Sequence, residues 1–261
     1  MDAAVREIEF LARSAHRVEI LYAVAEHPHR RDELRELTGA SPANLGRVLR
    51  SFEERNWIVR DGHYYEVTPL GEFVVNEFRD LHEAMNIEQK LRDVLQWLPA
   101  EVIGFDIQLF TDAVVTVPEF DSPHQTVSRF VELVNETETL FGFAPTTARS
   151  DMEALFRSAI DGMKIEVIFP SILIETVLAF HPEQAPKAIE SGNMDILTHD
   201  DLPCACAIFD DRIGLAGYDH ETGMMRVAID TDAPEARQWA KELYRSYRRD
   251  ARPLNPETLV A

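Results

Sequence analysis

The stretch TGASPANLGRVLRSFEERNWIVRDGHYYEVT, residues 38–68, decides the fold of the N-terminal part of the chain. Gly39 can take the left-handed conformation that ends a helix, and Ser41 followed by Pro42 is typical of a helix start. Apolar residues then recur at three- and four-residue steps, which predicts a helix that buries Leu45, Val48, Leu49 and Phe52. The pair Asp61-Gly62 between two strand-forming runs predicts a β-hairpin.

Two more helices are expected before this stretch. Apolar residues between Val18 and Ala25 have helical spacing, and the HPH segment at 27–29 breaks that helix. Residues 30–38 form a short helix with Leu34 and Leu37 facing inward. Three helices and a hairpin over residues 14–71 resemble the winged helix-turn-helix of archaeal regulators, and TPLG at 68–71 is a frequent ending of that domain. The resemblance implies sequence-specific contact with double-stranded promoter or operator DNA.

The same resemblance places the helix from Ser41 in the major groove, with its first residues nearest the base edges. There Asn44 can pair with adenine and Arg47 with guanine. Contacts to phosphates or the minor groove are expected from the rest of the helix and from the hairpin. The candidate DNA-binding residues are Ser41, Ala43, Asn44, Arg47, Arg50, Arg60, His63 and Tyr64. The alternative is a winged domain that contacts only protein.

The charge of the chain is unevenly spread. Its 261 residues include 46 acidic and 26 basic side chains, a formal net charge of −20, and few of the basic residues are lysine. An acidic, lysine-poor composition resembles that of proteins from salt-loving archaea, and the alternative is an acidic mesophilic protein. Between Arg13 and Tyr65, however, the sequence has nine arginines and eight acidic residues. This segment therefore does not share the strong negative charge of the chain and can approach a polyanion.

The sequence shows no sign of a membrane or secretory segment. No apolar run approaches the roughly 20 residues that a membrane span needs. Residues 1–14 are acidic and amphipathic, unlike a secretory signal. We therefore expect a cytoplasmic protein.

A long helix is predicted after the hairpin, because residues 69–98 have apolar side chains at helical steps and no Gly or Pro after Gly71. A helix in this place commonly pairs with its copy in another subunit. Residues 72–98 are therefore expected to connect the domains and to dimerise, and a homodimer would match a two-fold operator. The alternative is a helix packed on its own domain.

After Pro99 strands and helices alternate, and a run of antiparallel-looking strands precedes a last helix. Helices are expected to open at Ser122-Pro123, Asp151 and Ser171. The predicted fold class is α+β to α/β. Its parts are a winged helix-turn-helix at 1–71, the connecting helix at 72–98, an α/β effector domain at 99–250 and a flexible tail at 251–261.

Cys204-x-Cys206-x4-Asp211, followed by RIGLAGYD, has the spacing of the His-x-Lys-x4-Asp motif of phospholipase D-like proteins. Cysteines replace the nucleophilic His and the phosphate-holding Lys of that family, so we do not expect an enzyme. A winged helix joined to a degenerate phospholipase D-like domain resembles the TrmB-like and TbsP-like regulators of haloarchaea and the methanogenesis-regulator type of effector domain. This resemblance implies a transcription regulator of sugar or central carbon metabolism genes that responds to a metabolite.

Cys204 and Cys206 are the two cysteines of the chain. Positions two apart in a strand point the same way, which does not suit a disulfide between them. Small apolar filler is the simplest role. The alternatives are a pocket wall, a redox switch and a zinc site, the last of which lacks further ligands. No metal or cofactor is expected.

Residues 145–151, PTTARSD, are a better candidate for a ligand-binding site than the cysteines. Their hydroxyls, a guanidinium and the backbone amides at the start of a helix can hold an anion. Each such residue is alternatively only a helix cap. The candidate ligand-binding residues are Ser122, His124, Thr146, Thr147, Arg149, Ser150, Ser171, Cys204 and Asp219. The expected effector is a sugar or a phosphorylated or hydroxylated metabolite. The alternatives are a dimeric regulator whose C-terminal domain binds protein and, more remotely, a phosphodiesterase-like enzyme with a DNA-targeting module.

Overall fold

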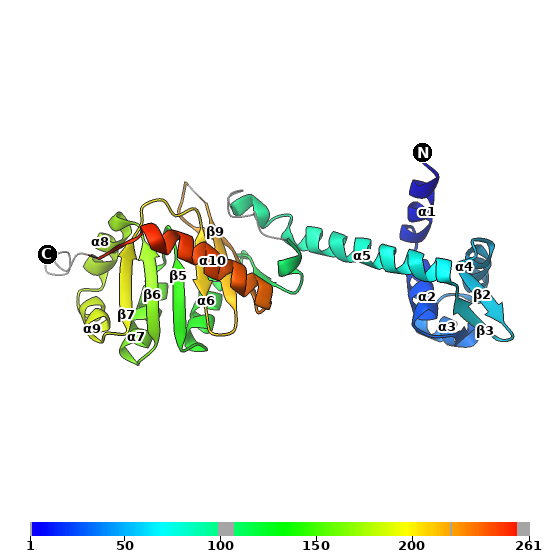
Figure 1. The fold of residues 1–261 in the computed structure, drawn as a ribbon, viewed down its shortest axis with the longest axis horizontal. Coiled ribbons are helices and arrows are strands. Elements are labelled where there is room, and N and C mark those ends of the chain that lie inside the picture. Colours follow the sequence, from blue (N-terminus) through cyan, green and yellow to red (C-terminus); the bar gives the residue numbers. More distant parts are fainter. Residues whose placement is uncertain (1, 99–106, 220, 255–261) are drawn as a thin grey trace. The chain divides into compact units, whose positions relative to one another are not determined.

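The computed structural model describes residues 2–98, 107–219 and 221–254. The chain forms two compact units, residues 1–86 and 87–261, and the division falls inside one long helix, α5 (Figure 1). The sequence instead predicts domain boundaries after residues 71, 98 and 250. The two units are described separately below.

The first unit has the predicted order of helices and hairpin. Its elements are α1 (Ala3–Ala12), α2 (Ala15–Glu26), β1 (His29–Arg30), α3 (Arg31–Thr38), α4 (Pro42–Glu54), β2 (Ile58–Asp61), β3 (Tyr64–Val67) and the first part of α5 (Pro69–Leu91).

The local signals at the start of α4 are confirmed. Gly39 ends α3 with a φ of 64°, and the Ser41 hydroxyl accepts a hydrogen bond from the Asn44 backbone N–H at 3.3 Å. Gly62 turns the hairpin with a φ of 59°. The predicted inward face of α4 is buried as expected, at Leu45, Val48, Leu49 and Phe52.

Two expectations for the first unit are wrong. Leu37 does not face inward, since 64% of its surface is exposed on the last turn of α3. The HPH segment ends α2 but is more than a break, because His29 and Arg30 pair with Tyr65 and Tyr64 as a third strand. The sheet order is therefore β1-β3-β2. Such a two-residue strand has no periodic signal of its own.

α5 is shorter than the predicted helix of residues 69–98. It ends at Leu91, and a separate 3-10 helix, η1, spans Leu95–Trp97. Val75 lies in the core of the first unit, whereas Ile87 and Leu91 lie in a core of the second. One helix thus belongs to both units, which explains why the sequence shows no break between them.

The second unit is built on one eight-stranded mixed sheet with the order β11-β7-β6-β5-β8-β9-β10-β4. Strands β5, β6 and β7 are parallel to one another, and the remaining pairs are antiparallel. The strands are β4 (Val114–Thr116), β5 (Thr139–Phe143), β6 (Lys164–Phe169), β7 (Met194–Thr198), β8 (Ala205–Ile208), β9 (Ile213–Tyr218), β10 (Met225–Thr231) and β11 (Arg252–Pro253).

Helices cover both faces of this sheet (Figure 1). The helices are η2 (Ile107–Phe110), α6 (Gln125–Asn135), α7 (Arg149–Ile160), α8 (Ser171–Phe180), α9 (Gln184–Glu190) and α10 (Pro234–Asp250). One core lies under α6 to α9, and the other lies under α10, η2 and the end of α5. Successive strand residues serve the two cores in turn, as the pleat requires.

Two boundaries of the second unit differ from the sequence prediction. The tail expected from residue 251 is part of the fold as far as Leu254, because β11 pairs with β7 and the Leu254 N–H donates to the Ile196 carbonyl at 3.1 Å. Residues 255–261 lie outside the described residues. The helix expected at Ser122-Pro123 begins at Gln125, and the helix expected from Asp151 begins at Arg149.

We predict that Gly217→Ala destabilises the second unit by about 1–3 kcal/mol, the usual cost of forcing extra volume into a packed core. A Cβ at Gly217 would overlap the backbone of Trp97 in η1, which cannot move aside like a flexible side chain. Gly214→Ala in the same strand is the control, since its Cβ would meet nothing closer than Phe209 at 3.5 Å. Thermal unfolding measures both variants, and equal stability would contradict this packing.

Candidate functional site

The exposed face of α4 carries the residues predicted to read DNA. Ala43, Arg47 and Arg50 are exposed, and Asn44 is half-buried beside them. No acid occurs between Pro42 and Phe52. The hairpin presents the other predicted residues, Arg60, His63 and Tyr64, and all of them are exposed. The candidate residues therefore lie on one helix and one hairpin of the same unit.

One arginine outside the candidate set, Arg17, lies near the face of α4. Arg17 of α2 lies near Arg47, and burial together with the charges of Arg55, Arg13 and Arg47 lowers the pKa of the Arg17 guanidinium. Positive groups from α1, α2 and α4 thus meet in one region. No local pattern reveals this, because the arginines are up to about forty residues apart in the chain.

Two further arginines fix the elements that carry the face. Arg31 donates a hydrogen bond to the Pro42 carbonyl at 2.9 Å and so holds α3 against the start of α4. The Arg30 guanidinium lies 5.0 Å from the centre of the Tyr64 ring, and its hydrogen bond to Tyr64 raises the pKa of Arg30. Arg30 therefore adds a positive charge near the turn of the hairpin.

The second unit contains a cavity between its sheet and helices α6 and α7. Its empty volume, the open mouth included, is about 720 Å³. Very small residues make up much of the floor that strands β5, β8, β9 and β10 supply, namely Gly142, Ala205, Ala207, Gly214, Ala216 and Ala228. Larger apolar side chains form the walls, among them Phe130, Leu133, Phe169 and Phe209.

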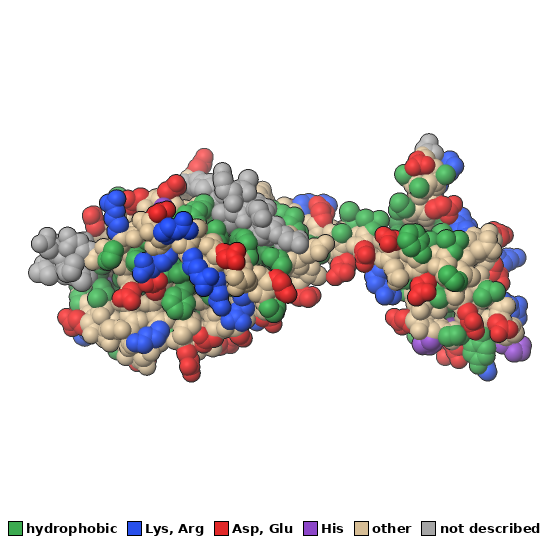
Figure 2. All heavy atoms as spheres, in the orientation of Figure 1, with side chains coloured by type: hydrophobic (Ala, Val, Ile, Leu, Met, Phe, Trp, Pro, Cys, Tyr) green, Lys and Arg blue, Asp and Glu red, His purple; other side chains and the backbone are tan. Residues whose placement is uncertain are grey.

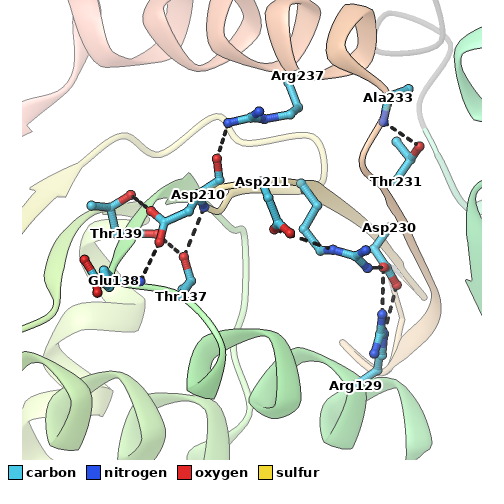
Figure 3. A network of polar contacts seen from close by, with 11 residues as sticks. Arg129, Thr137, Glu138, Thr139, Asp210, Asp211, Asp230, Thr231, Ala233 and Arg237 are labelled. Carbon is cyan, nitrogen blue, oxygen red and sulfur yellow. Dashed lines mark hydrogen bonds and ion pairs between the residues drawn. The ribbon is translucent and has the colours of Figure 1, made fainter.

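One end of the cavity is closed by a buried ion-pair cluster (Figure 3). Arg129 of α6 donates two hydrogen bonds to Asp230 of β10, from Nε at 3.0 Å and from Nη2 at 2.8 Å. Arg212 pairs with the same carboxylate. The hydrogen bonds to Asp230 raise the pKa of Arg129 far above its usual value. The positive charges at this end are therefore already neutralised in part.

Asp151 lines another part of the cavity, together with Thr146, Thr147 and Tyr218. Only 4% of Asp151 is exposed. One carboxylate oxygen accepts the Ala148 N–H at 3.2 Å and caps α7. The other oxygen is buried and has no partner among the described residues. Burial raises the pKa of the Asp151 carboxyl from 3.8 to about 6.

The predicted ligand residues do not gather in one place. Thr146 and Thr147 line the cavity, whereas Ser122, His124, Ser150, Ser171, Cys204 and Asp219 are not among its lining residues. Arg149 also lies outside the lining, with 67% of its side chain exposed and an ion pair to Glu153 at 3.1 Å. At the α7 start, the Asp151 carboxylate already takes the place that an anionic ligand would need.

Some of these residues have other partners. Asp219 accepts hydrogen bonds from Arg226 and from the Thr222 N–H in the β9–β10 turn, which lowers its pKa to about 2. Ser171 was expected to cap α8, but it is the first helical residue. Its N–H donates to Asp200 at 2.8 Å, so Asp200 serves that helix end. The contacts of Asp219 hold a turn and that of Ser171 caps a helix, so both residues have structural roles.

Cys204 and Cys206 are buried in the core under α10, and Cys206 also borders the cavity. Burial raises the pKa of the Cys204 thiol to about 12 and raises that of Cys206 as well. Asp211, the remaining residue of the phospholipase D-like frame, has a side chain that is 82% exposed. These residues do not form a shared catalytic site in the described structure.

The turn after β8 is held by the neighbouring Asp210 instead (Figure 3). Its carboxylate accepts the Glu138 N–H at 2.7 Å, and its carbonyl accepts a hydrogen bond from Arg237 of α10. Although burial acts in the opposite sense, the hydrogen bonds from Thr139 and Glu138 lower the pKa of Asp210. This network fixes the β8–β9 turn between the sheet and α10.

Positive side chains also gather over α10 (Figure 2). The exposed basic residues of this helix are Lys241, Arg245, Arg248 and Arg249. Arg248 pairs with Glu166 at 2.9 Å. The sequence analysis did not identify this second basic surface.

Two general features of the described residues bear on function. No group of three or more His, Cys, Asp or Glu side chains within residues 2–98, 107–219 and 221–254 could hold a metal ion. In the same ranges, no helix has both the length and the apolar composition for crossing a membrane.

Two family models match the chain. Residues 123–250 match the middle domain of the methanogenesis regulatory protein FilR1, and residues 5–90 match the HVO_A0261 N-terminal domain. The first match confirms the expected resemblance to a methanogenesis-regulator type of domain. No curated protein matches the chain.

Among solved structures, TrmBL2, an archaeal chromatin protein described as binding DNA in a novel mode, is 14% identical with a TM-score of 0.45. The match covers 95% of this chain and 99% of that one. NucT from Helicobacter pylori is 14% identical with a TM-score of 0.44, over 54% of this chain and 98% of that one. The phospholipase D family member Nuc from Salmonella typhimurium is 14% identical with a TM-score of 0.40, over 55% and 99%. Likenesses at these scores carry no conclusion about function.

We predict that Asp151→Asn stabilises the second unit above pH 6 by about 2–3 kcal/mol, since each unit of pKa shift corresponds to about 1.4 kcal/mol. The folded-state pKa is raised, so the folded protein holds this proton more tightly than the unfolded chain does. The contribution of Asp151 to wild-type stability therefore falls as the pH rises from about 4 to 6. The amide has no charge to desolvate, and its advantage should vanish near pH 4.

Urea unfolding at several pH values measures this difference. Glu153→Gln, on the same helix but exposed, is the control and should leave the profile unchanged. Parallel profiles for wild type and Asp151→Asn between pH 4 and 8 would contradict the assignment of a buried, unpartnered carboxylate.

Proposed function

We propose that the protein is a DNA-binding transcription regulator whose second unit is an effector domain. The observation that carries the proposal is the exposed face of α4, which has no acid before Glu53, begins at a capped turn after α3 and ends beside a hairpin. The match of residues 123–250 to a domain of a regulatory protein supports it. A regulator of this kind works in the cytoplasm of an archaeal cell, and the acidic, lysine-poor composition fits a salt-loving one.

In this proposal the first unit acts as a winged helix-turn-helix. α4 enters the major groove, Asn44 and Arg47 face base edges, and the hairpin is the wing. Arg50, Arg60, His63 and Tyr64 contact the backbone or the minor groove, and Arg30 joins them near the turn of the wing. In a protein with a net charge of −20, such local positive charge is needed to approach a polyanion.

A homodimer is the second part of the proposal. Leu70, Phe73, Leu81 and Met85 are exposed on α5, and a rotation of 100° per residue brings them to one face of the helix, which also carries the exposed Glu77. An exposed apolar stripe of this kind is covered when two copies pair. Pairing through α5 would place two DNA-binding units for a two-fold operator.

The third part concerns the effector. A concave, largely apolar cavity in the second unit favours a small ligand over a protein partner, which would need a flat or grooved surface. We infer a metabolite-responsive regulator, with central carbon or sugar metabolism genes as its targets. The runner-up is a dimeric regulator whose second unit binds protein. A phosphodiesterase-like enzyme is disfavoured by the two buried cysteines in its motif frame, and a phosphodiesterase assay tests it.

We predict that Arg47→Ala weakens binding to a cognate duplex by about 1–3 kcal/mol and leaves binding to random DNA nearly unchanged, as expected for a base-reading arginine. The cognate duplex is first selected from random duplexes by rounds of binding to the full-length dimer. Affinities are then compared at one fixed potassium chloride concentration, because phosphate contacts depend on salt.

Arg245→Ala is the matched control, since it removes the same charge from an exposed position on α10. Equal losses in both variants would show that α4 supplies only general electrostatic attraction. If no sequence is enriched by the selection, the proposal of a sequence-specific regulator fails.

We predict that Leu81→Glu converts the dimer to a monomer and lowers affinity for the selected duplex at least tenfold, because a charge on the apolar stripe cannot be buried between two helices. Light scattering after gel filtration gives the mass of each species. Glu83→Gln, exposed on the same helix, should remain dimeric. A Leu81→Glu variant that keeps the wild-type mass would move the dimer contact away from α5.

A further inference from the structure

The unpartnered oxygen of Asp151 is the least explained polar atom of the second unit. Capping α7 needs one oxygen, and the Ala148 N–H provides its partner. The second oxygen is buried at the cavity without a donor among the residues that the structure describes. Burying a carboxylate oxygen in this way is costly, and a protein that only needed a cap could use Ser or Thr.

The space beside Asp151 is produced by an asymmetry of the sheet. On the α10 face, strands β8, β9 and β10 carry large side chains, among them Ile208, Leu215 and Ile229. On the cavity face, the same strands carry mostly small residues, Ala205, Ala207, Gly214, Ala216 and Ala228, and the larger Tyr218 and Asp230 stand at its edges. A sheet face of Ala and Gly under two helices leaves room that protein side chains do not fill.

The polarity of the cavity selects the kind of molecule that fits. Its lining is mostly apolar, so the body of an occupant is apolar as well. Arg129 and Arg212 are committed to Asp230, and Arg149 is outside the lining. A ligand anion beside Asp151 would meet a like charge in a buried place. A donor, in contrast, would satisfy the free oxygen.

We propose that this cavity binds a small, mostly apolar molecule that donates a hydrogen bond from a hydroxyl, amide or ammonium group to the free oxygen of Asp151. Thr146 and Thr147 offer hydroxyls beside the same carboxylate for further polar groups of the ligand. This chemistry differs from the anion that the sequence predicted near Arg149. That the occupant acts as an effector rests on the proposed function, whereas its binding does not.

Methyl NMR of the full-length protein with labelled alanine tests the site, because several alanine methyl groups line the cavity floor. Ala205, Ala207, Ala216 and Ala228 are the reporters, and Ala236 and Ala240, buried on α10, are the reference. The probes are benzylamine, benzyl alcohol and benzoate, which share one ring and differ in the polar group. Each is titrated to about 10 mM, since ligands of this size bind in the millimolar range.

We expect benzylamine and benzyl alcohol to shift the floor methyls and not the reference methyls, with benzoate at least tenfold weaker. Asp151→Asn places an amide donor where the free oxygen was, so it should weaken benzylamine at least tenfold and remove the discrimination against benzoate. Glu153→Gln should change neither result. Ala207→Leu fills the floor and should weaken all three probes.

Two results would overturn the proposal. If no probe shifts the floor methyls, the cavity is not a ligand site of this kind. If the three probes bind alike, or if Asp151→Asn binds like wild type, Asp151 does not select the ligand. DNA affinity, measured separately, distinguishes these outcomes from a failure of the proposed function. If the protein binds the probes but no DNA, the proposed ligand site stands and the proposed function as a transcription regulator fails.

Discussion

The two faces of one sheet carry side chains of very different size, and the second unit depends on this difference. Ile208, Ile213 and Leu215 on one face pack densely against α10 and the end of α5. On the other face the side chains are mostly alanine and glycine, which are too small to fill the space between the sheet and helices α6 and α7. Burial on the first face stabilises the fold, so the second face can remain hollow.

A cavity between a sheet and two helices persists only if the helices are held in place. Asp230 is almost completely buried, and its charge is tolerated because Arg129 and Arg212 hold it from two directions. Removing one partner of a buried pair typically costs about 3–5 kcal/mol. The ion-pair cluster therefore fixes α6 to β10 at one end of the cavity. Asp151 caps α7 at another part of the lining, where no arginine compensates its charge.

Local sequence signals predicted the elements well and their assembly poorly. The caps and turns at Gly39, Ser41 and Gly62 were readable because each needs a particular residue at one position. The cavity was not readable, since its floor comes from four strands and looks in sequence like ordinary small residues. Arg129 and Asp230 are a hundred residues apart, and nothing in either segment points to the other. The sequence identified Thr146 and Thr147 as ligand residues. It predicted an anionic ligand, however, whereas the structure places both residues in a cavity lining that also contains the buried carboxylate of Asp151.

The sheet also connects the cavity to α5. Ile87 and Leu91 of that helix lie in the same core as Leu215 and Val227, whose strands form the cavity floor on their other face. A molecule that changed the twist or spacing of β9 and β10 would act on strands that pack against the last turns of α5. The size of the effect is limited by the difference in the ligand's affinity for the two arrangements. Because α5 continues into the first unit as one helix, it is the element through which such a change would reach the proposed DNA-binding surface.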